Sequence, residues 1–114
     1  MKTLADISLT DIDRRAVEAA ARILRERFPI ERVVLFGSKA RGDDDAESDI
    51  DLLVLTSRPV NAAEKSAMTD AVFDLQLDLG VVISKFIVAL KEWEEGYYQV
   101  LPIRSEIERD GVAA

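Results

Sequence analysis

The sequence contains no cysteine and no histidine among its 114 residues. Without cysteine, disulfide frameworks, thiol nucleophiles and thiolate metal sites are excluded. Without histidine, imidazole metal ligands and any serine–histidine–aspartate triad are excluded. Chemistry in this chain must therefore rest on carboxylates, hydroxyls, lysine, arginine and backbone groups, with a hard, oxygen-binding cation as the metal that such groups can hold.

Basic residues are outnumbered as well. There are 15 lysines and arginines against 22 acidic residues, which gives a formal net charge of -7. A surface of this sign repels a phosphate backbone, so we expect no direct nucleic-acid binding. No apolar run approaches membrane-spanning length and the N-terminal residues lack the apolar core of a secretory signal, so we expect no membrane contact and a cytoplasmic location.

The length and the 48% hydrophobic content fit a single globular domain over residues 1–114. Apolar periodicity and capping residues predict helices over 10–28, 61–79, 91–95 and 102–109. Short β-branched runs predict strands over 32–36, 49–56 and 81–88. This order predicts an α+β fold, a small mixed sheet with helices packed on one face.

Two aspartates lie two positions apart at the start of a predicted strand. Side chains alternate between the faces of a strand, so Asp49 and Asp51 emerge on one face, about 6.5–7 Å apart along the backbone. The apolar residues between and after them then point into the core. Two carboxylates on one rigid surface can converge on a hard divalent cation, so the pair is a candidate metal site.

A second polar feature follows the preceding strand. Gly37 allows a phosphate to approach the backbone, and Ser38 begins a short helical turn whose first amides are free to bind an anion. Ser38 also offers a hydroxyl, and Arg41 offers a guanidinium one turn later. A phosphate cradle facing a carboxylate pair is what metal-dependent phosphoryl or nucleotidyl transfer requires.

Other phosphate and cation motifs do not fit this region. The segment 37–42 lacks the Gly-Lys-Ser/Thr ending of a Walker loop. An EF-hand loop that began at Asp43 would need glycine at its sixth position and glutamate at its twelfth, where the sequence has Ser48 and Val54. We therefore expect the acidic run 43–47 to be a solvated loop, and Lys39 beside it to face the solvent.

The residues of this constellation occur in a characteristic order, with ten positions between the glycine–serine pair and the first aspartate: Gly37-Ser38, Ala40-Arg41-Gly42, Ser48 and Asp49-x-Asp51. This order, flanked by apolar strands, resembles the minimal nucleotidyltransferases of the DNA polymerase β-like superfamily. The resemblance covers nearly the whole chain, and it implies the nucleotidyltransferase fold.

The resemblance also implies a role for each motif residue. Gly37, Ser38 and Arg41 would hold the triphosphate of ATP, and Asp49 and Asp51 would bind magnesium and serve catalysis. The group transferred would be AMP, and the acceptor would be a hydroxyl, a tyrosine in characterised relatives, on a HEPN-type toxin. The chain would then be the antitoxin of a type VII pair and part of a hetero-oligomer.

One position departs from the superfamily pattern, which usually has a third carboxylate on the strand expected over 81–88. That segment contains no acid, although Asp74 and Asp78 precede it on the predicted helix. This departure favours an alternative, a weak or inactive module that neutralises a partner RNase by direct binding. Transfer to a small molecule such as an aminoglycoside is a further alternative, but such enzymes usually carry an additional substrate domain.

Overall fold

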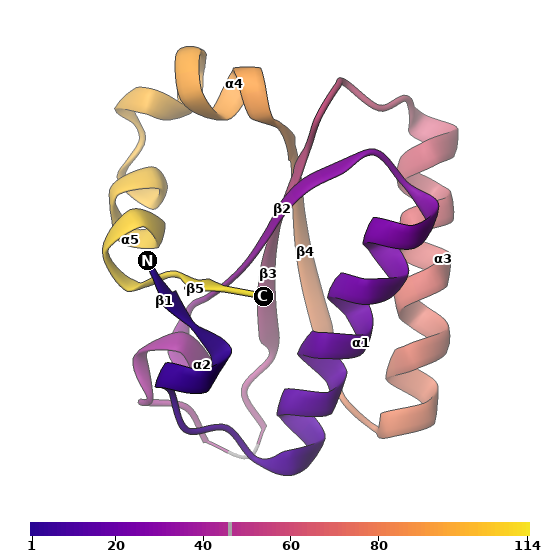
Figure 1. The fold of residues 1–114 in the computed structure, drawn as a ribbon, viewed down its shortest axis with the longest axis vertical. Coiled ribbons are helices and arrows are strands. Elements are labelled where there is room, and N and C mark those ends of the chain that lie inside the picture. Colours follow the sequence, from indigo (N-terminus) through magenta and orange to yellow (C-terminus); the bar gives the residue numbers. More distant parts are fainter. Residues whose placement is uncertain (46) are drawn as a thin grey trace.

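The structure, a computed structural model, describes residues 1–45 and 47–114. Across them the chain forms a five-stranded mixed sheet in the order β1-β5-β2-β3-β4 (Figure 1). Its strands are β1 (Lys2–Thr3), β2 (Ile30–Phe36), β3 (Ile50–Thr56), β4 (Ile83–Ala89) and β5 (Val112–Ala113). The strand β3 is antiparallel to β2 and parallel to β4.

The helices begin where the capping residues predict. Thr10 accepts a hydrogen bond from the backbone of Asp13 at 3.1 Å, and Asn61 forms a reciprocal capping box with Glu64. The helices are α1 (Asp11–Arg27), α2 (Ser38–Arg41), α3 (Ala62–Leu79), α4 (Leu90–Glu95) and α5 (Pro102–Asp110). Two 3₁₀ turns, Leu4–Asp6 and Tyr97–Val100, complete the described elements.

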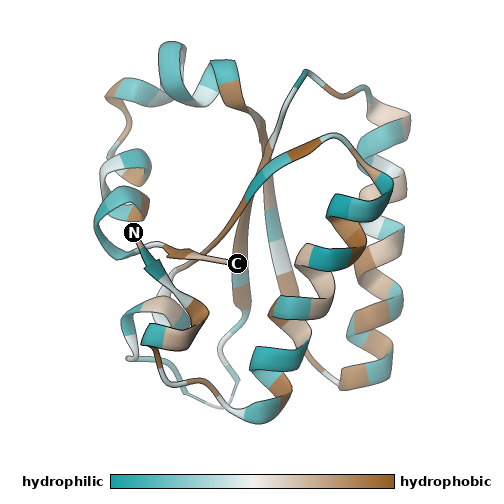
Figure 2. Ribbon diagram, viewed as in Figure 1, coloured by the Kyte–Doolittle hydropathy of each residue, from teal (hydrophilic) through white to brown (hydrophobic). Residues whose placement is uncertain are grey.

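Helices cover both faces of the sheet, which corrects the expected single layer. In Figure 1, α1 and α3 lie on one side of the strands, and α4 and α5 lie on the other. Leu52 and Val54 of β3 belong to the core beneath α1 and α3, whereas Leu53 and Leu55 belong to the core with α4 and α5. Apolar residues at four consecutive positions are typical of a strand that is buried on both faces, and Figure 2 shows β3 hydrophobic along most of its length. The α+β class and the mixed sheet are confirmed.

An aromatic cluster anchors the second layer. Trp93 on α4 is 4% exposed and meets Phe86 of β4 edge-to-face, with ring centroids 6.5 Å apart. Tyr98 contacts both rings. Edge-to-face packing of this kind adds to the stabilisation from burial. The cluster therefore holds the α4 segment against β4.

The short strands at the two ends of the chain were not predicted. β1 pairs with β5 in parallel, and β5 in turn pairs antiparallel with Val34 and Leu35 of β2. Two-residue strands carry no periodicity from which they can be recognised. Within the described residues, the structure contains no helix that combines the length and the apolar character needed to span a bilayer.

Candidate active site

The two predicted halves of the site meet at one end of the central strands. Asp51 is directly paired with Phe36 at the end of β2 and with Ser84 near the start of β4, so the three side chains share one face. Asp51 is half-buried, and Asp49, just before β3, is exposed. The carboxylates therefore lie at the open edge of a rigid three-strand platform.

Gly37 is the point of closest approach between the halves. Its φ of +77° lies in the region that side chains disfavour. A Cβ placed on Gly37 would lie only 3.2 Å from Cγ of Asp51 and would collide with its Oδ2. The position therefore requires glycine for its backbone angle and for the space that the Asp51 carboxylate occupies.

Ser38 and Arg41 are presented by the short helix α2. Gly37 begins this helix by accepting backbone hydrogen bonds from Ala40 and Arg41, both at 3.1 Å, and the amides of Ser38 and Lys39 have no carbonyl within the helix to bond to. The Arg41 guanidinium is exposed and donates from Nε to Asp43 at 3.2 Å. An exposed ion pair of this kind is weak, so Arg41 can exchange this carboxylate for a phosphate.

The electrostatics of the pair favour a cation. Burial raises the pKa of Asp51, the nearby charge of Asp49 raises it further, and the charge of Arg41 opposes both. The ionised pair is thus held together against mutual repulsion, which a divalent cation between the carboxylates would relieve. All of the predicted site residues, Gly37, Ser38, Arg41, Asp49 and Asp51, lie on this edge or on the adjoining helix, and their roles stay predictions.

Neither aspartate considered as a third carboxylate is brought to this edge. The helix α3 continues to Leu79, so Asp74 and Asp78 stay exposed on the helix. Among the described residues, no group of three metal-ligating side chains is present. The place beside Asp51 on β4 belongs to Ser84, whose hydroxyl lies 3.4 Å from Oδ2 of Asp49. Sequence periodicity did not single out Ser84, because parallel register cannot be counted from residue spacing.

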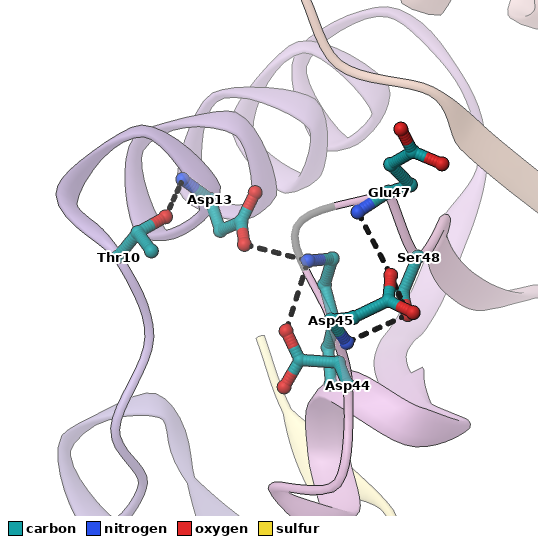
Figure 3. A network of polar contacts seen from close by, with 7 residues as sticks. Thr10, Asp13, Asp44, Asp45, Glu47 and Ser48 are labelled. Carbon is teal, nitrogen blue, oxygen red and sulfur yellow. Dashed lines mark hydrogen bonds and ion pairs between the residues drawn. The ribbon is translucent and has the colours of Figure 1, made fainter.

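Lys39 is buried, not solvent-facing as expected. Its Nζ donates to Oδ2 of Asp13 at 2.8 Å and to Oδ2 of Asp44 at 3.1 Å, and its side chain is 4% exposed (Figure 3). Burial alone would lower the pKa of Lys39, but the hydrogen bonds and charges of the two aspartates outweigh it and raise the pKa. The ion pair ties α2 to the first turn of α1.

The acidic segment after α2 is organised by local hydrogen bonds. Oδ1 of Asp45 accepts from the backbone of Glu47 at 2.9 Å, and the backbone of Asp45 donates to the Ser48 hydroxyl at 3.0 Å (Figure 3). The expected solvated loop is confirmed for Asp43, Asp45 and Glu47, which are exposed. Asp44 differs in that it is a partner of the buried Lys39, and Ala46 lies outside the described residues.

Comparisons with known proteins agree with this geometry. The family model described as "Nucleotidyltransferase domain" matches residues 17–113. A relative from Methanocaldococcus jannaschii, provisionally named a protein adenylyltransferase, is 32% identical over 81 residues, which are 71% of this chain and 80% of the relative.

Solved structures give the same result for the fold. A provisionally named minimal nucleotidyltransferase has a TM-score of 0.60 and 27% identity, with 92% of this chain and 97% of that chain covered. A chain in the complex of a tri-AMPylated HEPN toxin with an MNT antitoxin from Shewanella oneidensis has a TM-score of 0.52 and 16% identity, with coverage of 89% and 70%. The resemblance to minimal nucleotidyltransferases is thereby confirmed. The chain is a nucleotidyltransferase and belongs to the nucleotidyltransferase domain family.

Proposed function

We propose that this nucleotidyltransferase transfers AMP from ATP to a hydroxyl of a partner protein. The observation that carries the proposal is the contact of Gly37 with Asp51, so close that a Cβ on Gly37 would collide with the carboxylate. The backbone that we propose to bind phosphate would thus lie beside the carboxylates that we propose to bind the metal. The M. jannaschii relative, named for protein adenylylation, supports a protein acceptor. The Shewanella complex, which pairs an MNT antitoxin with an AMPylated HEPN toxin, supports a toxin of that class as the partner. A tyrosine as the acceptor is the part of the proposal that rests on the resemblance alone.

The donor set fits magnesium. Mg²⁺ prefers oxygen ligands and is commonly held by one or two carboxylates together with substrate phosphates. Asp49 and Asp51 would hold the ion, and it would supply charge neutralisation at the phosphate where transfer occurs. The Gly37–Ser38 backbone and the Ser38 hydroxyl would orient the triphosphate. Arg41 would leave Asp43 to bind a phosphate oxygen.

The transfer itself is an in-line displacement. The acceptor hydroxyl oxygen forms a bond to the α-phosphorus of ATP, and the bond from that phosphorus to the oxygen bridging to the β-phosphate breaks. Pyrophosphate leaves with the electron pair of that bond, the hydroxyl proton passes to solvent, and the acceptor keeps AMP as a phosphodiester. The residues of this chain bind and orient the triphosphate, and no covalent intermediate on the chain is needed.

The test is adenylylation of a co-expressed HEPN-type partner. With ATP and magnesium, mass spectrometry should show the partner heavier by one or more AMP groups. Asp49→Asn and Asp51→Asn should abolish the addition, because each removes a charged oxygen ligand. Asp70→Asn is the matched control, since it removes the same charge from an exposed position on α3 that belongs to no predicted site. Full transfer by both site variants would refute the assignment.

A second candidate function is neutralisation by direct binding, and Ser84 in place of an acid is the observation that favours it. In that case the Asp51→Asn variant would still suppress the partner's RNase activity when the two are mixed without ATP. If suppression requires ATP and an intact Asp51, adenylylation is the mechanism.

A further inference from the structure

We infer that Ser84 makes this site dependent on the nucleotide for metal binding, so that a divalent cation enters with the triphosphate and not before it. The inference deepens the proposed function and rests on Asp49 and Asp51 being the metal ligands. It makes Ser84 the residue that determines how many carboxylates the cation meets.

The position of Ser84 is set by the sheet. It is paired with Asp51 in the register of β3 and β4, and neighbouring strands lie about 4.8 Å apart, so its side chain stands beside that carboxylate on the same face. Its hydroxyl lies 3.4 Å from Oδ2 of Asp49, so Ser84 is a neighbour of both aspartates. A carboxylate carried at position 84 would therefore face both aspartates.

Charge explains the consequence of a serine at this place. Divalent cations gain affinity with the number of charged oxygen ligands, and two carboxylates leave most of an octahedral shell to water. Ser84 is neutral and donates its proton toward Asp49, which orients that carboxylate without adding a negative charge. Among the described residues, no third metal-ligating side chain joins the two aspartates, so further negatively charged ligands would be phosphate oxygens, which arrive with the nucleotide.

Nothing in the packing prevents an acid at position 84. Ser84 is exposed, and no described hydrogen bond links its side chain to a residue other than Asp49. A longer side chain there keeps contact with solvent and pays no burial penalty. The serine is therefore replaceable, and Ser84→Asp is a direct test.

The test measures Mn²⁺ binding to the purified protein, with free Mn²⁺ followed by electron paramagnetic resonance and with a protein-free mixture of Mn²⁺ and AMP-PNP as the reference for the ion that the nucleotide binds by itself. We expect the wild type to bind Mn²⁺ weakly alone and, with AMP-PNP present, to bind far more Mn²⁺ than the protein alone and this reference together account for. Ser84→Asp should bind Mn²⁺ alone roughly tenfold more tightly than the wild type, because it adds a charged ligand. Ser84→Asn, which has the shape of aspartate without its charge, is the matched control and should resemble the wild type.

Two outcomes would overturn the inference. One is a wild type that, with AMP-PNP present, binds no more Mn²⁺ than the protein alone and the protein-free nucleotide reference together account for. The other is a Ser84→Asp variant no tighter than Ser84→Asn while thermal melting shows both folded. Adding Asp51→Asn to Ser84→Asp should remove the gain, which locates the ion at this site. The pattern of Mn²⁺ binding does not depend on AMP transfer. If the expected Mn²⁺ pattern is found but no AMP is transferred, the proposed function is refuted and this inference is not.

Discussion

Replacing Asp13 by asparagine should destabilise the protein through Lys39. The Nζ of Lys39 is 2.8 Å from Asp13 and 3.1 Å from Asp44, and the lysine side chain is almost fully enclosed. Asp13→Asn keeps the size of the side chain and the backbone hydrogen bond to Thr10, but it removes one of the two charges that compensate the buried ammonium. Lys39 would then depend on Asp44, whose side chain is 26% exposed.

The magnitude follows from these contacts. Removing one partner of a fully buried pair costs about 3–5 kcal/mol. Here Asp44 remains as a second, more hydrated partner, so we expect a loss of about 2 kcal/mol in the free energy of unfolding. For a domain of this size the change corresponds to a fall in Tm of roughly 8 °C.

The assay is urea unfolding followed by circular dichroism. Asp11→Asn is the matched control, because Asp11 is in the same first turn of α1 but is exposed, and its loss should cost only about 0.5 kcal/mol of helix-dipole stabilisation. The double variant Asp13→Asn/Lys39→Met should lose less than the sum of the single losses, since the two residues act on each other. If Asp13→Asn is no less stable than Asp11→Asn, the buried ion pair does not stabilise the fold.

Three further results are expected. Asp51→Asn should raise the stability of the nucleotide-free protein at neutral pH, because the folded pKa of Asp51 lies above its unfolded value and its ionisation therefore opposes folding. In urea titrations below about pH 4 the gain in stability should disappear, because there the unfolded carboxylate is protonated too. A stability difference that is the same at both pH values would contradict the raised pKa. Gly37→Ala should abolish detectable binding of AMP-PNP in calorimetry, because the added Cβ meets the Asp51 carboxylate and the backbone angle is unfavourable for alanine. Gly42→Ala is the control for the backbone angle alone and should retain binding, because a Cβ there meets no atom within 4 Å. The stabilisation by Lys39, measured as the stability difference from Lys39→Met, should be fully present below the unfolded lysine pKa of about 10.4. It should be lost as the pH rises through the raised folded pKa of Lys39. A stability difference that persists at still higher pH would count against the ion pair.

Local signals predicted the parts of the fold that depend on neighbouring residues. Thr10 and Asn61 begin their helices because each side chain caps a backbone amide three residues on. The alternation after Asp51 assigned the side chains of β3 to alternate faces, because strand side chains alternate whatever the rest of the fold does. Asp49 was predicted to begin this strand, which in the structure begins one residue later, at Ile50. The α+β class followed from the same local rules, but the strand bounds shifted: β2 begins at Ile30, two residues before the predicted strand, and β4 begins at Ile83, two residues after it.

The features that sequence reasoning missed depend on distant residues. Lys39 is buried because Asp13, 26 positions earlier, is brought to it by the packing of α1 near α2, and no local pattern carries that pairing. Ser84 lies beside Asp51 because the crossover through α3 sets the parallel register of β4. The second helical layer was hidden because an apolar run such as 52–55 is compatible with burial on one face or on both until α4 and α5 are placed.

The packing of Trp93 on Phe86 supplies an internal optical probe. The sequence has one tryptophan, so intrinsic emission comes from a single indole held against β4. Phe86 is two positions from Ser84 on the same face of that strand. A shift of β4 on ligand binding would therefore change the emission wavelength or intensity of Trp93. Nucleotide titrations could then be followed by intrinsic fluorescence, without a dye or label.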